Sequence, residues 1–175
     1  YVLCEQIKIG SKRLNIQDCY EDVKAAYEAD PTKPAPTLEN CGYLLELDTN
    51  YDEDQKFKTS HYSIPFMFKE PVDGSTGTIF NAVKTKVQRI EDNIYNKKYS
   101  DAYTELDINS VIDQWLIWEL TMNHEVLDPR SVYFFMDGNK KLSAGPVWDF
   151  DRATFQNPTN AKNQGSSRER VKPYD

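Results

Sequence analysis

The stretch SVYFFMDGNKKLSAGPVWDFD, residues 131–151, decides how the C-terminal half of this sequence folds. Two runs rich in β-branched and aromatic residues, 131–136 and 141–148, flank the turn residues DGNK, which predicts a β-hairpin. The second strand is expected to lead directly into Asp149 and Asp151, which lie on either side of a phenylalanine. Carboxylates rarely lie in apolar surroundings without a partner, so these two acids mark a candidate functional site.

Two helices are predicted upstream of this hairpin. Apolar residues at helical spacing define the first over about 76–97, and the second follows the N-capping residue Asp107 and ends near Asn123. The buried stripe expected on the first helix consists of Ile79, Val83, Val87, Ile90 and Ile94. The broad apolar face expected on the second consists of Ile108, Val111, Ile112, Trp115, Leu116 and Met122, and Trp115 and Trp118 are expected to be core residues.

The N-terminal half alternates strand-like and loop-like segments. Strands are predicted at 1–9, 42–49 and 64–71, and a short helix at about 18–29, followed by the proline-rich loop 30–37. The polar segment 50–62 is expected to be a loop or an edge hairpin. Strands early, helices in the middle and a hairpin late predict an α+β fold.

Length and charge limit the classes of protein. The chain has 175 residues, enough for one domain over 1–155, and the polar segment 156–175 is predicted to be a mobile tail. A formal net charge of −7 argues against a nucleic-acid partner, and apolar runs are too short for a transmembrane segment. The chain starts at Tyr1 without a Met or a signal-like segment, so we expect it to be a fragment.

The cysteines are Cys4, Cys19 and Cys41, without the spacing of a zinc site. They are expected to be buried, inert thiols, and a bridge between Cys4 and Cys41 stays open.

The order of elements also suggests a chemistry. In protein kinases a helix leads into a catalytic loop, and a hairpin then presents an aspartate to magnesium. Here the corresponding loop is NHEVLDPRS, residues 123–131, in which Glu125 and Asp128 are the candidate catalytic acids. Ser131 stands where a kinase places its second metal-binding residue, and Asp149 stands at the first, with Asp151 beside it. Such carboxylates hold Mg²⁺, which neutralises phosphate charge.

Four stretches, in this order, resemble the spore coat protein H (CotH) family of kinase-like proteins. They are YVLCEQIKIGSKRLN, CGYLLELDTNYDEDQKF, DINSVIDQWLIWELTMNHEVLDPRSVYFF and GPVWDFDRATF, and they span roughly residues 1–155. The resemblance implies an atypical protein-kinase-like fold, of which this chain holds mainly the large helical lobe, part of the inter-lobe sheet and not the upstream small-lobe segment. It also implies ATP- and divalent-metal-dependent phosphorylation, as for spore coat protein, with Mg²⁺ or Mn²⁺.

The resemblance assigns roles to individual residues. Asp149 and Asp151 are implied to bind the metal, with Ser131 where the family often has Asn. Glu125 is implied to be the catalytic acid, although the family commonly has Asp there, and Asp128 is the alternative. Glu5 and Gln6 are implied to end the strand at which the adenine edge docks. The variant motifs are similar to those of extracellular forms in gut and polysaccharide-degrading bacteria, which implies a bacterial-surface or extracellular location.

Two functions therefore stay open. The first is a phosphotransferase that binds a nucleotide and modifies a protein or surface component. The second is a catalytically weak or inactive kinase-fold scaffold within an extracellular assembly beside carbohydrate-active modules, which Glu125 and Ser131 favour.

Three further features are interpreted as structural. His124 at a helix end is expected to be structural or solvated, and His61 is expected to lack acidic partners at ligand spacing. The acidic run 48–54 is read as a solvated loop, since it lacks the spacing of a calcium-binding EF-hand.

Overall fold

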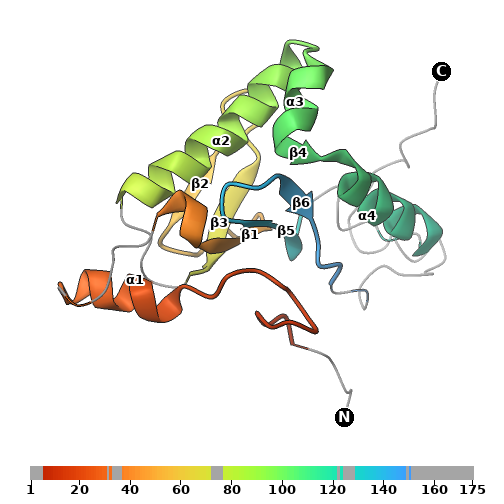
Figure 1. Cartoon of the computed structure of the whole chain (residues 1–175). Coiled ribbons are helices and arrows are strands. Elements are labelled where there is room, and N and C mark those ends of the chain that lie inside the picture. The colour runs from red at the N-terminus through yellow and green to blue at the C-terminus, as the bar shows by residue number, and fades with distance from the viewer. Residues whose placement is uncertain are drawn as a thin grey trace, which may run out of the picture.

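The computed structural model describes residues 6–30, 32, 37–71, 77–121, 123, 129–148 and 150. In chain order its elements are α1 (Tyr20–Tyr27), the short 3-10 helix η1 (Leu38–Asn40), β1 (Gly42–Leu47), β2 (Lys56–Lys58), β3 (Pro65–Glu70), α2 (Gly77–Tyr95), α3 (Tyr99–Glu105), β4 (Leu106–Asp107), α4 (Ile108–Thr121), β5 (Val132–Asp137) and β6 (Leu142–Ala144). Helices and strands are interleaved around one mixed sheet (Figure 1), which confirms the α+β class.

Within the described residues, the sheet has six strands in the order β2-β3-β1-β5-β6-β4. β1 lies at its centre and pairs antiparallel with both β3 and β5. β2 is one edge, so the edge-hairpin alternative for the polar segment is the correct one. At the other edge, β4 pairs parallel with β6 and connects directly to α4.

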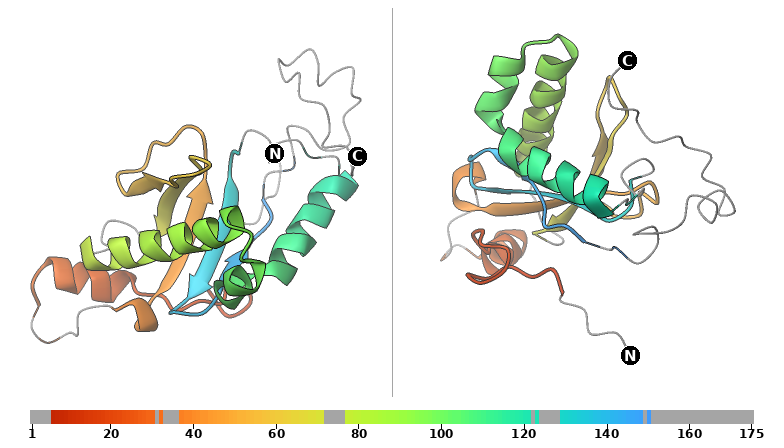
Figure 2. Two further views of the ribbon diagram at one scale, coloured as in Figure 1. Left: turned by 90° about the horizontal axis from the view of Figure 1, so that it is seen from above. Right: turned by 90° about the vertical axis from the view of Figure 1, so that its right-hand side faces the viewer.

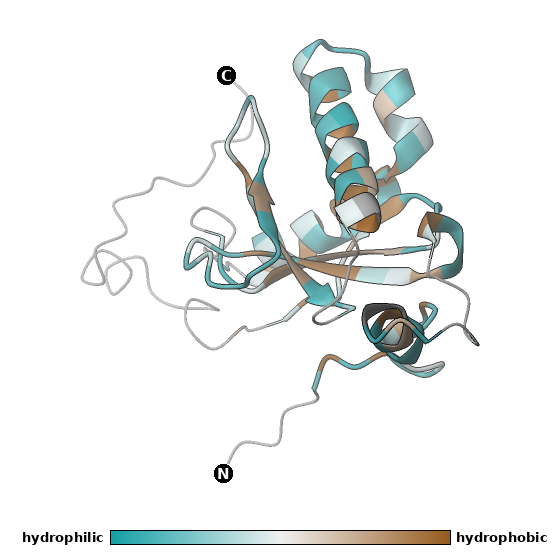
Figure 3. Cartoon of the chain, turned by 90° about the vertical axis from the view of Figure 1, so that its left-hand side faces the viewer, coloured by the Kyte–Doolittle hydropathy of each residue, from teal (hydrophilic) through white to brown (hydrophobic). Residues whose placement is uncertain are grey.

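The main core lies between the sheet and α2, which crosses one face of the sheet (Figure 2). Side chains alternate along a strand, so Tyr43 and Leu45 of β1 point into this core. Apolar colouring gathers on the strands and on the α2 surface that faces them (Figure 3). Leu44 points to the opposite face, where it packs with Tyr133 and with Leu14 of the N-terminal segment.

Several predicted boundaries are wrong, for local reasons. Residues 6–8 are not in a strand, and Ile9 makes only an isolated bridge to Leu14 around a turn at Gly10. β6 ends at Ala144, so it does not lead directly into Asp149 as expected. Gly145 adopts a φ of 119°, and the next residue, Pro146, has no backbone N–H to continue the ladder. The short helix α3 and η1 were not predicted at all.

The two long helices, α2 and α4, lie at their predicted positions, but the predicted burial is largely confirmed only for α2. The α2 stripe is buried except for Ile94, which lies in the last turn of the helix and is exposed. The predicted core face of α4 is wrong: Ile112, Trp115 and Leu116 are all exposed, Trp115 at 52%. α4 lies at the β4–β6 end of the sheet (Figure 2). Of the predicted face, Val111 packs partly buried against the core, and Gln114, which was not predicted, is buried.

Cys19 and Cys41 are free and buried, as predicted. The Cys19 thiol donates to the carbonyl oxygen of Asn40 at 3.2 Å, and burial raises the pKa of both thiols. Cys4, the third cysteine, lies outside the described residues.

No helix among the described residues is both long enough and apolar enough to cross a membrane.

Candidate functional site

Most of the predicted site residues lie outside the part of the chain that the structure describes. These are Glu5, Glu125, Asp128, Asp149 and Asp151. His124, which is expected to be structural or solvated, also lies outside the described residues. Gln6 and Ser131 are the two predicted site residues that are described. The structure therefore describes the predicted site only around these two residues.

Gln6 is exposed and lies outside any strand. Its carbonyl oxygen accepts a hydrogen bond from the Arg13 guanidinium at 3.3 Å. The resemblance predicts an inter-lobe strand that ends at Glu5 and Gln6, but Gln6 does not belong to a strand. The reason is local, because the chain turns at Gly10 instead of pairing with the sheet.

Ser131 lies immediately before β5 and has a φ of 50°, which is unusual for a residue other than glycine. Its backbone N–H donates to Asp48 Oδ2 at 3.3 Å. Asp48 follows β1 directly, and its other oxygen, Oδ1, accepts the N–H of Asn50 at 2.6 Å. One carboxylate therefore fastens the end of β1 to the start of β5.

Asp48 was read from the sequence as the first residue of a solvated acidic loop. That reading is wrong for Asp48, which is only 7% exposed. A backbone hydrogen bond from the Thr49 N–H to the Pro129 carbonyl oxygen, at 2.9 Å, continues the β1–β5 pairing past both strand ends. The signal in the sequence was the strand period, since positions 44, 46 and 48 fall on one face of β1.

A polar network extends from this strand end across the same face of the sheet. Glu46 is buried, and its two oxygens meet the Tyr133 hydroxyl at 3.0 Å and the Lys69 ammonium at 3.3 Å. Lys69 also donates to Glu53 Oε1 at 2.5 Å. We call Glu46, Asp48, Glu53, Lys69, Ser131 and Tyr133 the strand-end network.

The electrostatics of the strand-end network follow from burial. Burial, with the nearby charge of Glu46, raises the pKa of Tyr133 well above its ordinary value, so this hydroxyl stays protonated and donates to Glu46. A side-chain hydrogen bond from Ser131 to Tyr133 acts in the opposite direction. Burial alone would lower the pKa of Lys69, but Glu53 and Glu46 together raise it, so Lys69 stays charged.

The strand-end network can hold neighbouring residues in fixed positions. Lys69 offsets part of the negative charge of Glu46 and Glu53, and Asp48 accepts backbone N–H groups. The members of the network come from β1, β3, β5 and the turn after β1. It holds Ser131 at a fixed place at the end of the segment that joins α4 to β5. That segment contains Glu125 and Asp128 in the sequence.

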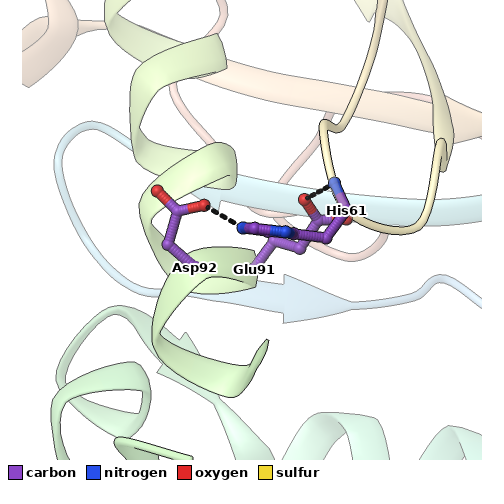
Figure 4. Close-up of side chains that lie close together, drawn as sticks. All are labelled: His61, Glu91 and Asp92. Carbon is purple, nitrogen blue, oxygen red and sulfur yellow. Dashed lines mark hydrogen bonds and ion pairs between the residues drawn. The ribbon is translucent and has the colours of Figure 1, made fainter. Parts of the chain in front are cut away.

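A second group of ionisable residues was missed from the sequence. His61, in the turn between β2 and β3, meets Glu91 and Asp92 of α2, although the sequence offers it no acidic partners at ligand spacing (Figure 4). Its Nε2 lies 3.0 Å from Asp92 Oδ1, and its backbone N–H donates to Glu91 Oε2 at 2.9 Å. The partners are 31 and 30 residues away in the sequence, so no local spacing could reveal them. We call these three residues the helix–turn cluster.

No family model, no curated protein and no solved structure matches this chain. The resemblance to the CotH family accordingly stays a prediction from the four sequence stretches.

Proposed function

We propose that this chain is the larger part of a kinase-like phosphotransferase domain that uses ATP with Mg²⁺ or Mn²⁺. The observation that carries the proposal is the ordered set of CotH-like stretches, ending in the acids Asp149 and Asp151. The order α4, β5, turn, β6 that the structure describes is compatible with that set. The phosphoacceptor would be a protein or a surface component, and the setting a bacterial surface or extracellular space.

The donor set suits the proposed metal. Asp149, Asp151 and Ser131 offer only oxygen atoms, which are the ligands that Mg²⁺ and Mn²⁺ prefer. The metal would neutralise charge on the transferred phosphoryl group. The strand-end network supports this role because it fixes Ser131, which a weak ligand such as a hydroxyl needs.

The remaining roles follow the resemblance. Glu125, or Asp128 in its place, would orient the acceptor hydroxyl, and Glu5 and Gln6 would lie near the adenine. Catalysis of this type depends on positioning and electrostatic stabilisation, with little covalent chemistry by the protein.

The test is thermal unfolding with and without Mn²⁺–ATP. A ligand that binds only the native state raises the unfolding midpoint. We expect a rise that disappears in the double variant Asp149→Asn, Asp151→Asn. The matched control is Asp113→Asn, Glu119→Gln, which removes the same charge from exposed positions of α4 and should retain the rise.

A form that includes any segment encoded upstream of Tyr1 is tested in parallel, since the resemblance places basic phosphate-contacting residues there. A rise in neither form, with both folded, would reject the phosphotransferase proposal. It would leave the second candidate, a kinase-fold scaffold in an extracellular assembly. Glu125 and Ser131 favour that candidate, because the family commonly has Asp and Asn at these positions.

A further inference from the structure

We propose that the helix–turn cluster of His61, Glu91 and Asp92 binds a divalent transition-metal ion, for which Zn²⁺ is the probe. One ligand atom from each residue lies within 4.8 Å of the others. The site joins the β2–β3 turn to α2, and none of its residues belongs to the proposed phosphotransfer site (Figure 4). It is thus independent of the proposed function.

The imidazole of His61 is already oriented. Its ring stacks on Tyr95, one helical turn beyond Glu91, with centroids 3.9 Å apart and planes 8° from parallel. The hydrogen bond from its backbone N–H to Glu91 fixes the main chain, and the ring then directs Nε2 at Asp92. A ligand held in this way loses little freedom when a metal binds.

The carboxylates at the cluster are poorly compensated. Glu91 is 5% exposed, and within the described parts of the chain neither it nor Asp92 forms an ion pair with a lysine or arginine. Glu91 accepts hydrogen bonds from the backbone N–H groups of His61 and Tyr62 and from the Gln88 amide, which are neutral donors. A dication would supply the positive charge that this pair of acids lacks.

The side-chain amide of Gln88 contacts the carboxylates of both Glu91 and Asp92. Its amide Nε2 lies 3.0 Å from Glu91 Oε2 and 2.7 Å from Asp92 Oδ1, so its hydrogens approach both carboxylates. A metal ion that binds here displaces the Gln88 amide from the two carboxylates. The change is local, because the side chains of His61 and Asp92 are 29% and 47% exposed and can adjust.

The donor types select the class of metal. An imidazole with carboxylates suits Zn²⁺ and related ions, whereas Mg²⁺ and Ca²⁺ prefer oxygen alone. Zinc takes nitrogen and carboxylate oxygen ligands at about 2.0–2.2 Å, usually four in number. The cluster supplies three, and water at the exposed side completes the set.

The experiment is a calorimetric titration of the folded chain with ZnCl₂, on the wild type and on His61→Gln and Asp92→Asn. Loss of even an outer-shell partner weakens metal affinity by about 10–100-fold, so we expect each variant to lose at least that much. The controls are His124→Gln, which removes the other histidine of the chain, and Asp101→Asn, which removes an exposed carboxylate from α3. Both controls should bind as the wild type does.

Glu91 is left unchanged because it also anchors the turn, so its loss would confuse folding with binding. In the metal-bound wild type, NMR should show displaced ring signals of His61 and undisturbed ones of His124. The Asp149→Asn, Asp151→Asn variant should still bind Zn²⁺, which separates this site from the phosphotransfer site. Absence of saturable binding, or equal affinity in the wild type, His61→Gln and Asp92→Asn, would overturn the proposal.

Discussion

Helices α2 and α4 carry similar sequence signals and have different environments. Both show apolar residues at helical spacing, and both form where the spacing predicts. The stripe on α2 is covered by the sheet, and Val83 at its centre is fully buried. On α4 the apolar face is exposed, with Leu120 at 76%.

The difference lies in what each helix contacts. α2 crosses the strands and shares one core cluster with β1, β3 and β5. α4 follows β4 at the edge of the sheet, where β4 pairs with β6 (Figure 2). Apolar periodicity therefore predicts that a helix forms, while burial depends on a partner that the periodicity does not name.

The largest expected effect comes from truncating an α2 core residue. Ile90→Ala should lower the free energy of unfolding by about 3 kcal/mol, because it leaves a cavity under the helix. The matched substitution on α4, Ile112→Ala, removes the same atoms from a side chain that is 44% exposed and should cost under about 1 kcal/mol. Urea unfolding at neutral pH measures both.

Equal losses of unfolding free energy at the two positions would contradict the difference in burial between α2 and α4. They would mean that the apolar face of α4 is covered in solution.

The second effect concerns Lys86, a lysine that α2 buries. Its ammonium donates to the carbonyl oxygens of Asn139 and Lys140 at 3.1 and 2.5 Å, which ties α2 to the β5–β6 turn. Lys86→Met keeps the apolar stem and removes these bonds, at an expected cost of about 2 kcal/mol in unfolding free energy. Lys84→Met, at an exposed position of the same helix, is the control and should change stability by under about 0.5 kcal/mol.

Urea unfolding measures the unfolding free energy of both lysine variants. A Lys86→Met protein as stable as the wild type would show that burial of the ammonium costs as much as its hydrogen bonds return. Burial lowers the pKa of Lys86, which reflects this desolvation cost.

A smaller effect depends on pH and lies between α2 and α3. Arg89 donates two hydrogen bonds to the carboxylate of Glu105, which lowers the pKa of Glu105 below its ordinary value and raises that of Arg89. A carboxyl whose pKa is lower in the folded state stabilises the protein above its unfolded pKa. That contribution is lost as the pH falls through the folded value.

Glu105→Gln should accordingly cost about 0.5–1 kcal/mol at pH near 7, since Arg89 is half exposed and solvent screens the pair. The difference from the wild type should vanish in acid, below the folded pKa of Glu105. Unfolding curves recorded from neutral to acidic pH test this. A difference that persists unchanged in acid would assign the effect to packing.

The smallest effect is expected on the exposed face of α4. Leu120→Gln exchanges an exposed apolar side chain for a polar one with similar helix propensity, so unfolding free energy should change by under about 0.5 kcal/mol. Thermal and urea unfolding provide the measurement. A loss above about 1.5 kcal/mol would again mean that this face is covered in solution.

Local pattern predicted a good part of the fold. The α+β class is confirmed, and the strands β1 and β3, both long helices and the β5–turn–β6 hairpin lie where the sequence predicts them. The wrong element boundaries lie where a single residue sets the backbone geometry. Gly145 ends β6 early, and the turn at Gly10 replaces the predicted strand at residues 6–9.

The candidate site was less accessible to sequence reasoning. Ser131 was singled out, and its anchor Asp48 was read as solvated, because the two are 83 residues apart. The partner acids of His61 were missed for the same reason. The roles proposed for Glu125, Asp128, Asp149 and Asp151 stay predictions from the resemblance.

By itself the sequence determined which segments form helices and strands, because the period of apolar residues reflects the geometry of one element. It also determined the acidic balance of the chain and the order of its elements. Only the tertiary structure decided that α2 is covered and α4 is not, and that Asp48 meets Ser131 and His61 meets Asp92. The physical reason is that burial and charge pairing act between elements, and such distances are set only once the sheet is assembled.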